Sequence, residues 1–307
     1  MVSILVPVYN SAPFLKECVQ SLTGQTYTDL QIVLINDGST DGSWDILLEL
    51  ARQDKRIEVY SKANGGVAET RNQLLKKARG EWVLFIDSDD WIEPDTVESL
   101  INEQAVGNYD IVSYKMSGKT DGNGTIVYTR QQAVKLFLEH ITFRGSLWDK
   151  MIRRSLFEGL SFDAGVCYGE DALMVWQVLQ RAEKICVLNK GFYHYRVNPN
   201  SISRQSFNGM KFSAYTTWDS ICSDVKKSLP EYREIAHARF ACEMTQLLYA
   251  AARNGYPHNS SVQLLQEIIR RDGRYIKKTG ISSLKMSLFA WLVSHNYYIA
   301  RFVSRYV

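Results

Sequence analysis

The stretch Trp82-Val83-Leu84-Phe85-Ile86-Asp87-Ser88-Asp89-Asp90 decides the fold of this chain. Its first five residues are apolar, and such a run predicts a buried strand. Three carboxylates follow at the strand end, and crowding them costs electrostatic energy unless a cation offsets their charge. Their hard oxygen atoms suit Mg²⁺ or Mn²⁺, which take a few carboxylates together with substrate phosphates. The stretch therefore predicts a divalent-metal site; the alternative is a turn that caps a helix beginning at Pro94.

Before this stretch, short apolar strands alternate with helical patterns. We expect strands at residues 2–8, 30–35 and 57–60, and helices after Ser11, after Asp41 and over residues 67–78, the last ending near Gly80. This alternation predicts βαβ units and a parallel sheet, which binds ligands at the carboxyl ends of its strands. Polar sequences follow three of the strands, at Tyr9-Asn10, residues 36–39 and residues 87–90. We expect these sequences to converge on one edge of the sheet and to form a site.

Two further positions near this edge suggest contacts to a nucleotide. Asp37 lies in a glycine-rich turn, where a carboxylate can accept a hydrogen bond from the N3–H of uracil; turn chemistry alone is the alternative. Arg71 follows the Gly65-Gly66 loop and could meet nucleotide or acid groups as a planar fork, or form a surface salt bridge. GxGxxG and Walker A spacings are absent from the sequence, which disfavours nicotinamide binding and ATP hydrolysis.

The second half of the chain carries fewer chemical signals. Glu170 and Asp171 open a predicted helix; their charges would stabilise its first turn, or Asp171 would act as a general base. His194 is either a packed structural histidine or a contact to metal or phosphate. Arg196 and the segment 198–203 could close over a diphosphate as a basic loop.

Charge and cysteine content narrow the classes of protein. The net charge of +3 divides unevenly, because residues 205–307 hold 14 Lys+Arg against 7 Asp+Glu, while the remainder holds 22 against 26. Five scattered cysteines without CxxC spacing are typical of free thiols in the cytoplasm. We find neither an export signal nor an apolar run long enough to span a bilayer. The basic excess lacks a nucleic-acid-binding module, so nucleic acid is not an expected partner.

From about Met210 the sequence predicts only helices, at residues 212–225, 232–252, 262–276 and 284–303. We therefore expect an α/β domain over residues 1–205 and a helical subdomain over residues 206–307. The last predicted helix carries an apolar stripe of large side chains: Leu284, Leu288, Trp291, Leu292, Ile299, Phe302, Val303 and Tyr306. The stripe either packs on the other helices or lies on an anionic membrane surface as a peripheral contact.

Several motifs together resemble a known family. They are VSILVPVYN at residues 2–10, NDGSTD at 36–41, NGG at 64–66, RN at 71–72, DSDD at 87–90, WDK at 148–150, GED at 169–171 and YHYR at 193–196. Their order over roughly residues 1–200 resembles the family-2 inverting glycosyltransferases of bacterial capsule, exopolysaccharide and lipopolysaccharide assembly. The resemblance implies a GT-A fold, in which a Rossmann-like, mostly parallel sheet with flanking helices binds a nucleotide-sugar, and we expect a UDP-sugar here.

The resemblance also implies a role for each matching residue. The base-binding residues would be Pro7, Tyr9, Asp37 and Arg71, with Asp87 on the ribose and Ser88 in the same nucleotide-binding motif. Asp89 would hold the divalent metal, Mn²⁺ or Mg²⁺, with His194 as a candidate second ligand. Asp171 would be the general base of the reaction. Contacts to donor or acceptor would come from Trp148, Lys150, Glu170 and Arg196.

The reaction implied by the resemblance is a single displacement with inversion onto a hydroxyl of a glycan or lipid-linked acceptor. Three other classes of protein are alternatives to a glycosyltransferase. A glycoside hydrolase would use paired carboxylates without nucleotide-like turns after parallel strands. A sugar nucleotidyltransferase would carry a glycine-rich basic loop near its N-terminus, where Pro7-Val8-Tyr9-Asn10 stands instead. A non-catalytic relic that only binds a nucleotide-sugar would lack a metal ligand or a base.

Overall fold

The structure is a computed structural model that describes residues 1–119, 124–198 and 207–303. The chain forms two compact units. The first unit comprises Met1–Val134, Gly145–Ala164 and Met174–Asn198. The second comprises Lys135–Arg144, Gly165–Leu173 and Pro199–Val307. The predicted domain boundary at residue 205 lies outside the described residues. So does the part of the predicted loop segment 198–203 that follows Asn198.

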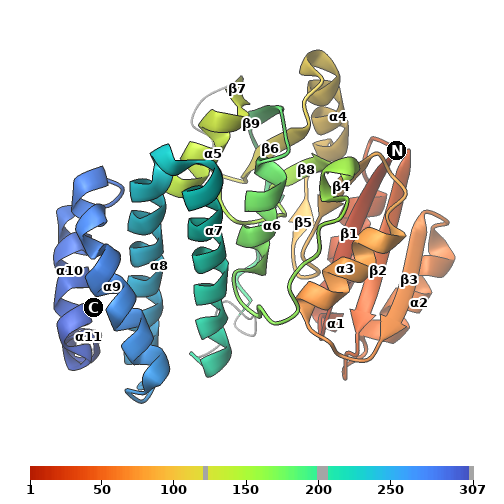
Figure 1. The fold of residues 1–307 in the computed structure, drawn as a ribbon. Helices are drawn as coiled ribbons and strands as arrows, with labels where there is room; N and C mark the ends of the chain where they lie inside the picture. The colour runs from red at the N-terminus through yellow and green to blue at the C-terminus, as the bar shows by residue number, and fades with distance from the viewer. Residues whose placement is uncertain (120–123, 199–206, 304–307) are drawn as a thin grey trace. The chain divides into compact units, whose positions relative to one another are not determined.

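The first unit alternates strands and helices along the chain (Figure 1). Its strands are β1 (Val2–Val8), β2 (Leu30–Asp37), β3 (Ile57–Lys62), β4 (Trp82–Phe85), β5 (Trp91–Ile92), β6 (Ile111–Met116), β7 (Thr125–Thr129), β8 (Lys150–Arg153) and β9 (Lys184–His194). Its helices are α1 (Ala12–Thr23), α2 (Ser43–Gln53), α3 (Val67–Lys77), α4 (Thr96–Gly107) and the 3-10 turn η1 (Arg154–Phe157). Two helices contain residues of both units, α5 (Arg130–Glu139) and α6 (Glu170–Leu179).

The strands form one mixed sheet in the order β3-β2-β1-β4-β8-β6-β9-β5, with β7 paired to β9. The N-terminal strands β3, β2, β1 and β4 are all parallel, as their alternation with helices predicts. Antiparallel pairs enter at β8, β5 and β7. The parallel half therefore places the carboxyl ends of β1, β2 and β4 at one edge, where the polar sequences emerge.

The core of the first unit explains why these strands form. Every residue of β2 is buried, and the burial of β1 is broken only at Pro7, which is half-buried. Helix α1 covers the sheet with Leu15, Cys18, Val19 and Leu22, which recur at helical spacing. Strands buried on both faces read as continuous apolar runs, which is why sequence alone locates them.

The second unit is helical apart from its short connections (Figure 1). Its helices are η2 (Gly209–Ser213), α7 (Ala214–Ser228), η3 (Pro230–Tyr232), α8 (Arg233–Arg253), α9 (Ser260–Thr279), α10 (Leu284–His295) and α11 (Tyr297–Val303). Side chains of Asn259 and Ser283 cap α9 and α10 by accepting hydrogen bonds from Val262 N and Met286 N. No helix among the described residues is long and apolar enough to cross a membrane.

Three local predictions were wrong. The sequence around Lys190-Gly191 predicts two short strands, at residues 187–188 and 192–195, but one strand, β9, runs unbroken from Lys184 to His194. Gly80 does not end α3, which stops at Lys77; its N–H donates to Ser3 Oγ at 2.8 Å, where the two chain segments lie close. The predicted helix over 284–303 is broken at Asn296 into α10 and α11.

The predicted apolar stripe of the last helices lies mostly on their exposed side. Among the described residues, most of it does not pack on the other helices, which was one of the two alternatives for it. Leu284, Leu288, Trp291 and Phe302 are between 59% and 71% exposed, and Leu292 and Ile299 are half-buried. The buried side of these helices carries smaller residues instead, such as Ala290, Val293 and Ala300. The side chains of Val303 and Tyr306 lie outside the described residues.

Candidate functional site

The turns that follow β1, β2 and β4 are tied together by side-chain hydrogen bonds. Ser39 Oγ accepts from Asn10 N at 2.9 Å, and Thr40 N donates to Asn10 Oδ1 at 2.8 Å. Ser11 Oγ and Ser88 Oγ are 2.7 Å apart and join the turn after β1 to the turn after β4. The predicted convergence of the three polar sequences on one edge of the sheet is therefore present in the first unit.

Asp37, at the end of β2, is 4% exposed and holds the loop that precedes α3. Its Oδ1 accepts from Lys62 Nζ at 2.5 Å and from Gly65 N at 2.8 Å, and its Oδ2 accepts from Gly66 N at 3.0 Å. Each carboxylate oxygen has two lone pairs, so Oδ2 keeps the capacity to accept one more hydrogen bond. Asp37 thus fixes the Gly65-Gly66 loop and can still recognise an N–H of a ligand.

Arg71 lies in α3 and points toward the carboxylates after β4. Its guanidinium is 3.6 Å from Asp87 Oδ1 and lies over the ring of Phe162, at 5.9 Å from the ring centre. The Arg71 side chain is 7% exposed, whereas that of Asp87 is 35% exposed. A buried cation therefore compensates one of the three crowded carboxylates, and Asp87 remains accessible to a ligand.

Asp89 and Asp90 have different environments although they are neighbours. Asp89 is half-buried, and its Oδ2 accepts from Asn198 Nδ2 at 2.9 Å. Asp90 is 2% exposed and accepts from Tyr193 Oη at 2.6 Å and from Arg196 N at 2.7 Å. Burial raises the pKa of Asp90 to about 7, against the opposing effect of these two hydrogen bonds. Asp90 therefore positions the turn from within, while Asp89 is the carboxylate on its accessible side.

His194 lies at the end of β9 and is held by β5. Its ring stacks on Trp91, with ring centres 4.9 Å apart, and its Nε2 is 2.6 Å from Glu93 Oε1. The Glu93 contact occupies Nε2, one of the two ring nitrogens through which a histidine can bind a metal. Its role as a second metal ligand stays a prediction, and the geometry is that of a packed, hydrogen-bonded histidine.

Arg196 contacts two of the three acidic residues after β4, Asp89 and Asp90. Its Nε donates to the backbone oxygen of Asp89 at 2.9 Å, and its guanidinium pairs with Glu17 and lies 4.6 Å from the ring centre of Trp91. Arg196 therefore fixes the Asp89 turn from the C-terminal end of β9. Its predicted contact to donor or acceptor is not tested by these bonds.

Trp148 and Lys150 lie beneath the same edge. Trp148 stacks on Tyr193, with ring centres 4.3 Å apart, and its backbone oxygen accepts from Tyr114 Oη. Lys150 is 1% exposed and donates to Asp149 Oδ1 at 2.5 Å and to Ser146 O at 2.7 Å. Pro7 is half-buried in β1, whereas Tyr9 is 50% exposed just after it. Of these four predicted contact residues, Tyr9 has the most freely accessible side chain.

Asp171 and Glu170 stand in the first turn of α6 and belong to the second unit. Both side chains are half-buried. The segment before them is anchored within that unit, because Ser213 Oγ accepts from Cys167 N and Tyr168 N, and Thr217 Oγ1 donates to Gly169 O at 3.1 Å. Gly169, whose φ is +91°, directly precedes α6. These hydrogen bonds to residues 167–169 therefore hold the start of α6 in place within the second unit.

Two contributors to this arrangement were given no role from the sequence, Lys62 and Tyr193, whereas Asn198 begins the predicted loop segment 198–203. Lys62 and Tyr193 lie in strands, and their partners Asp37 and Asp90 are distant in sequence. No local pattern signals such pairs. The position of Tyr193 directly before His194 in a conspicuous aromatic run was the one available hint.

The donor set around Asp89 fits a divalent cation that is completed by a ligand. Among residues 1–119, 124–198 and 207–303, no three His, Cys, Asp or Glu side chains gather as a metal-binding group. Mg²⁺ sites in phosphate-handling proteins use only one or two carboxylates plus substrate phosphates. Asp89 supplies one such carboxylate, and Asp87, two residues before it and paired with Arg71, leaves it room for substrate phosphates.

Comparisons with known proteins identify the family. The model of Glycosyl transferase family 2 matches residues 3–174, which is more than half of the chain. The chain belongs to this family, as the motifs predict, and membership places it among the glycosyltransferases. EpsJ of Bacillus subtilis, an uncharacterized glycosyltransferase, is 35% identical over 216 residues. That alignment covers 66% of this chain and 63% of EpsJ, so the chain spans less than two thirds of this relative.

Solved structures show the same fold. The complex of S. aureus TarS with UDP-GlcNAc matches with a TM-score of 0.67 and 21% identity, over 99% of this chain and 88% of that one. The mannosyltransferase PcManGT from Pyrobaculum calidifontis, in complex with GDP-Man and Mn²⁺, matches with a TM-score of 0.60 and 18% identity, over 96% and 87%. The predicted GT-A fold, with a mostly parallel sheet and a helical C-terminal part, is confirmed.

Proposed function

We propose that this chain transfers a sugar from a UDP-sugar to a hydroxyl group of a glycan or lipid-linked acceptor in cell-surface polysaccharide synthesis, with inversion. The observation that carries the proposal is the joining of the three turns at the carboxyl edge of the parallel strands. That edge is where open α/β sheets bind their ligands. The nucleotide-sugar in the TarS complex and in the PcManGT complex supports a donor of this class.

The residues of the edge divide into three tasks. Asp37 and Arg71, with Tyr9 and Pro7, would hold the base, and the open lone pair of Asp37 Oδ2 would accept the N3–H of uracil. Asp87 and Ser88 would contact the ribose. Asp89 would hold Mn²⁺ or Mg²⁺, which when bound offsets charge on the departing diphosphate. Trp148, Lys150, Glu170 and Arg196 are proposed to shape the donor and acceptor subsites, directly or by positioning their neighbours.

Asp171 is the proposed general base. It would remove the proton from the acceptor hydroxyl while that oxygen attacks the anomeric carbon from the side opposite the leaving diphosphate. The bond to the new oxygen forms as the bond to the diphosphate oxygen breaks, and the configuration inverts. The support for Asp171 is its place in the GED motif of the family and in the first turn of α6.

The test is calorimetric titration of UDP into the protein with and without Mn²⁺, on the wild type, Asp89→Asn and a control, Asp45→Asn. Asp45 is an exposed carboxylate on α2, outside the joined turns. We expect binding that strengthens with Mn²⁺ in the wild type and in Asp45→Asn, and loses that dependence in Asp89→Asn. Binding by Asp89→Asn that responds to Mn²⁺ as in the wild type would remove Asp89 from the metal site.

The reaction class is tested separately. UDP-sugars are offered with lipid-linked acceptors, and the product is analysed for transfer and for its anomeric configuration. Transfer with inversion supports the proposal. Tight binding of UDP and UDP-sugars without turnover on any acceptor would favour the non-catalytic relic, and retention of configuration would overturn the single-displacement mechanism.

A further inference from the structure

Helix α10 presents two different apolar faces. Its buried face consists of Ala290 and Val293, with Ser294 beside them, all at most 2% exposed. Leu284, Leu288 and Trp291 are 71%, 60% and 59% exposed. They follow one another at intervals of four and three residues, so they line one side of the helix. A helix that is apolar all round is normally covered all round, and α10 is covered on one side only among the described residues.

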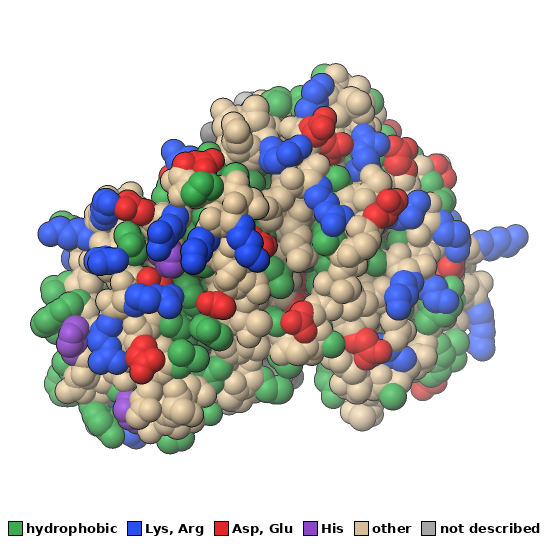
Figure 2. Space-filling view, in the orientation of Figure 1, with side chains coloured by type: hydrophobic (Ala, Val, Ile, Leu, Met, Phe, Trp, Pro, Cys, Tyr) green, Lys and Arg blue, Asp and Glu red, His purple; other side chains and the backbone are tan. Residues whose placement is uncertain are grey.

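Helix α11 continues the same pattern. Tyr297 and Ala300 are buried, whereas Tyr298 and Phe302, four residues apart, are each 63% exposed. Figure 2 shows hydrophobic side chains at the left edge of the view, where Figure 1 places α10 and α11. We call the exposed residues Leu284, Leu288, Trp291, Tyr298 and Phe302 the apolar face. Large apolar side chains exposed along one side of a helix are characteristic of a site of interaction with a protein or a membrane.

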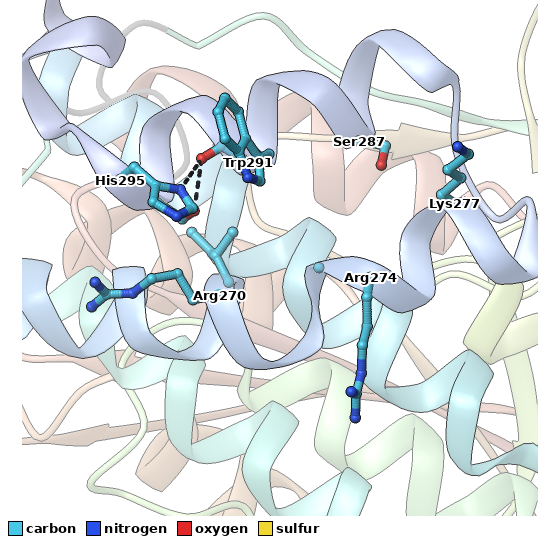
Figure 3. Close-up of a pocket in the computed structure, with 9 residues that line it drawn as sticks. Arg270, Arg274, Lys277, Ser287, Trp291 and His295 are labelled. Atoms are coloured by element: carbon cyan, nitrogen blue, oxygen red, sulfur yellow. Dashed lines mark hydrogen bonds between the residues drawn. The ribbon is translucent and has the colours of Figure 1, made fainter.

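The surroundings of the apolar face are cationic. Residues 273–307 contain six Lys or Arg and neither Asp nor Glu. A groove of about 450 Å³ runs between α9 and α10, and its lining includes Arg270, Arg274, Lys277 and Trp291. Figure 3 shows Arg270 and Lys277 toward the two ends of the groove, with Trp291 on α10 beside it. These cations follow one another at helical spacing along α9, and all three are exposed.

We propose that α9, α10 and α11 dock this protein onto an anionic phospholipid surface, with the apolar face entering the interface and the cations of the groove meeting lipid phosphates. Interfacial helices combine aromatic and aliphatic side chains with Lys and Arg in this way. A second copy of the chain fits the surface less well. A two-fold contact brings identical patches together, so Arg270, Arg274 and Lys277 of one copy would face the same cations of the other, with Glu267 as the one exposed carboxylate of α9 to offset them.

The test is co-sedimentation of the full chain with phosphatidylcholine vesicles that contain or lack phosphatidylglycerol. The apolar variant is Leu288→Ser with Trp291→Ser, and its control is Ile141→Ser, which removes another exposed aliphatic side chain, 65% exposed. The charge variant is Arg270→Glu with Lys277→Glu. Its control is Lys226→Glu with Lys227→Glu, which reverses two exposed lysines on α7. All seven substitutions in these four variants are at exposed positions, and thermal unfolding confirms that each variant is folded.

We expect the wild type to bind only the vesicles with phosphatidylglycerol, and less strongly as salt is raised. At about 1 kcal/mol per basic residue, the charge variant loses about 30-fold or more in affinity. The apolar variant loses about tenfold or more, because two large side chains no longer enter the interface. Both controls keep wild-type affinity.

Three results would overturn the proposal. The first is absence of binding to anionic vesicles at low salt. The second is an equal loss in the variants and their matched controls. The third is a wild-type dimer that the apolar variant converts to a monomer while vesicle binding is unchanged. None of these readouts involves sugar transfer, so the proposed membrane contact and the proposed enzyme activity can fail independently.

Discussion

Replacing Asp37 by Asn tests the centre of the joined turns with the smallest change in shape. The carboxylate is 4% exposed and accepts three hydrogen bonds, from Lys62 Nζ, Gly65 N and Gly66 N. An amide has one acceptor oxygen and one donor nitrogen, so in either orientation its NH₂ group faces an N–H group. The substitution also removes the charge that pairs with Lys62, whose side chain is 11% exposed.

The expected cost follows from these contacts. Removing one partner of a buried ion pair typically costs about 3–5 kcal/mol. Lys62 keeps a second, more exposed partner in Glu69 Oε2 at 3.4 Å, which reduces that figure. We therefore expect Asp37→Asn to lower the free energy of unfolding of the first unit by about 2–4 kcal/mol. Hydrogen exchange at the amides of Gly65 and Gly66 should accelerate most, because these N–H groups lose their acceptor.

The assay is denaturant unfolding followed by hydrogen exchange of residues 62–70, with Asp45→Asn as the control. Asp45 lies exposed in the first turn of α2, so its neutralisation should cost less than about 1 kcal/mol. Combining Asp37→Asn with Lys62→Gln completes a double-mutant cycle, and we expect a coupling energy of about 1–3 kcal/mol. A stability within about 0.5 kcal/mol of the wild type, or a cycle without coupling, would refute the assignment of Asp37 as the clamp of this loop.

Three further predictions concern other positions. Gly38→Ala should destabilise the protein by about 1 kcal/mol or more, because φ is +67° and the new Cβ would lie 2.7 Å from Asn64 N; Gly42→Ala, with nothing within 4 Å, should be close to neutral in thermal unfolding. Hydrogen bonds from Arg56 lower the pKa of Asp54, so the pair stabilises the fold above the usual Asp pKa near pH 4 and loses that effect as the pH falls through the lowered value. Asp54→Asn should therefore cost about 1 kcal/mol or less near pH 7, and the difference from the wild type should vanish in strong acid; a difference that grows toward low pH contradicts this. Asp171→Asn should reduce kcat for sugar transfer by about 10²–10⁴-fold and leave UDP binding unchanged in calorimetry, and a variant with full kcat would exclude Asp171 as the base.

The parallel half of the sheet could be predicted because its signals are local. The strands β1, β2 and β4 are buried apolar runs, and polar turns follow each of them directly in the sequence. Parallel strands bring their carboxyl ends to one edge, so the joining of these turns follows from the order of elements. The ordered motifs likewise predict the family, which the family model confirms.

Two of the predictions that failed share a physical cause, because two glycines act through distant contacts. Gly191 lies within β9, where a Cβ would stand 2.9 Å from Met116 O of the neighbouring strand β6. A Cβ on Gly80 would stand 2.6 Å from Ser3 N. Both glycines permit close approach of two backbones rather than a turn, and their partners are more than 70 residues away. A local pattern therefore takes them for turn residues.

The last two helices show the same limit for packing. Periodicity locates a stripe of large apolar side chains on α10, but the stripe is on the exposed side of the helix. Ala290 and Val293 face the neighbouring helices instead, and small residues let two helices approach closely. Ranking positions by hydrophobicity selects the larger residues and so selects the wrong face. Among the described residues only one face of α10 is buried, so packing against the other helices does not explain why Leu284, Leu288 and Trp291 are apolar, whereas the membrane contact proposed above would cover them.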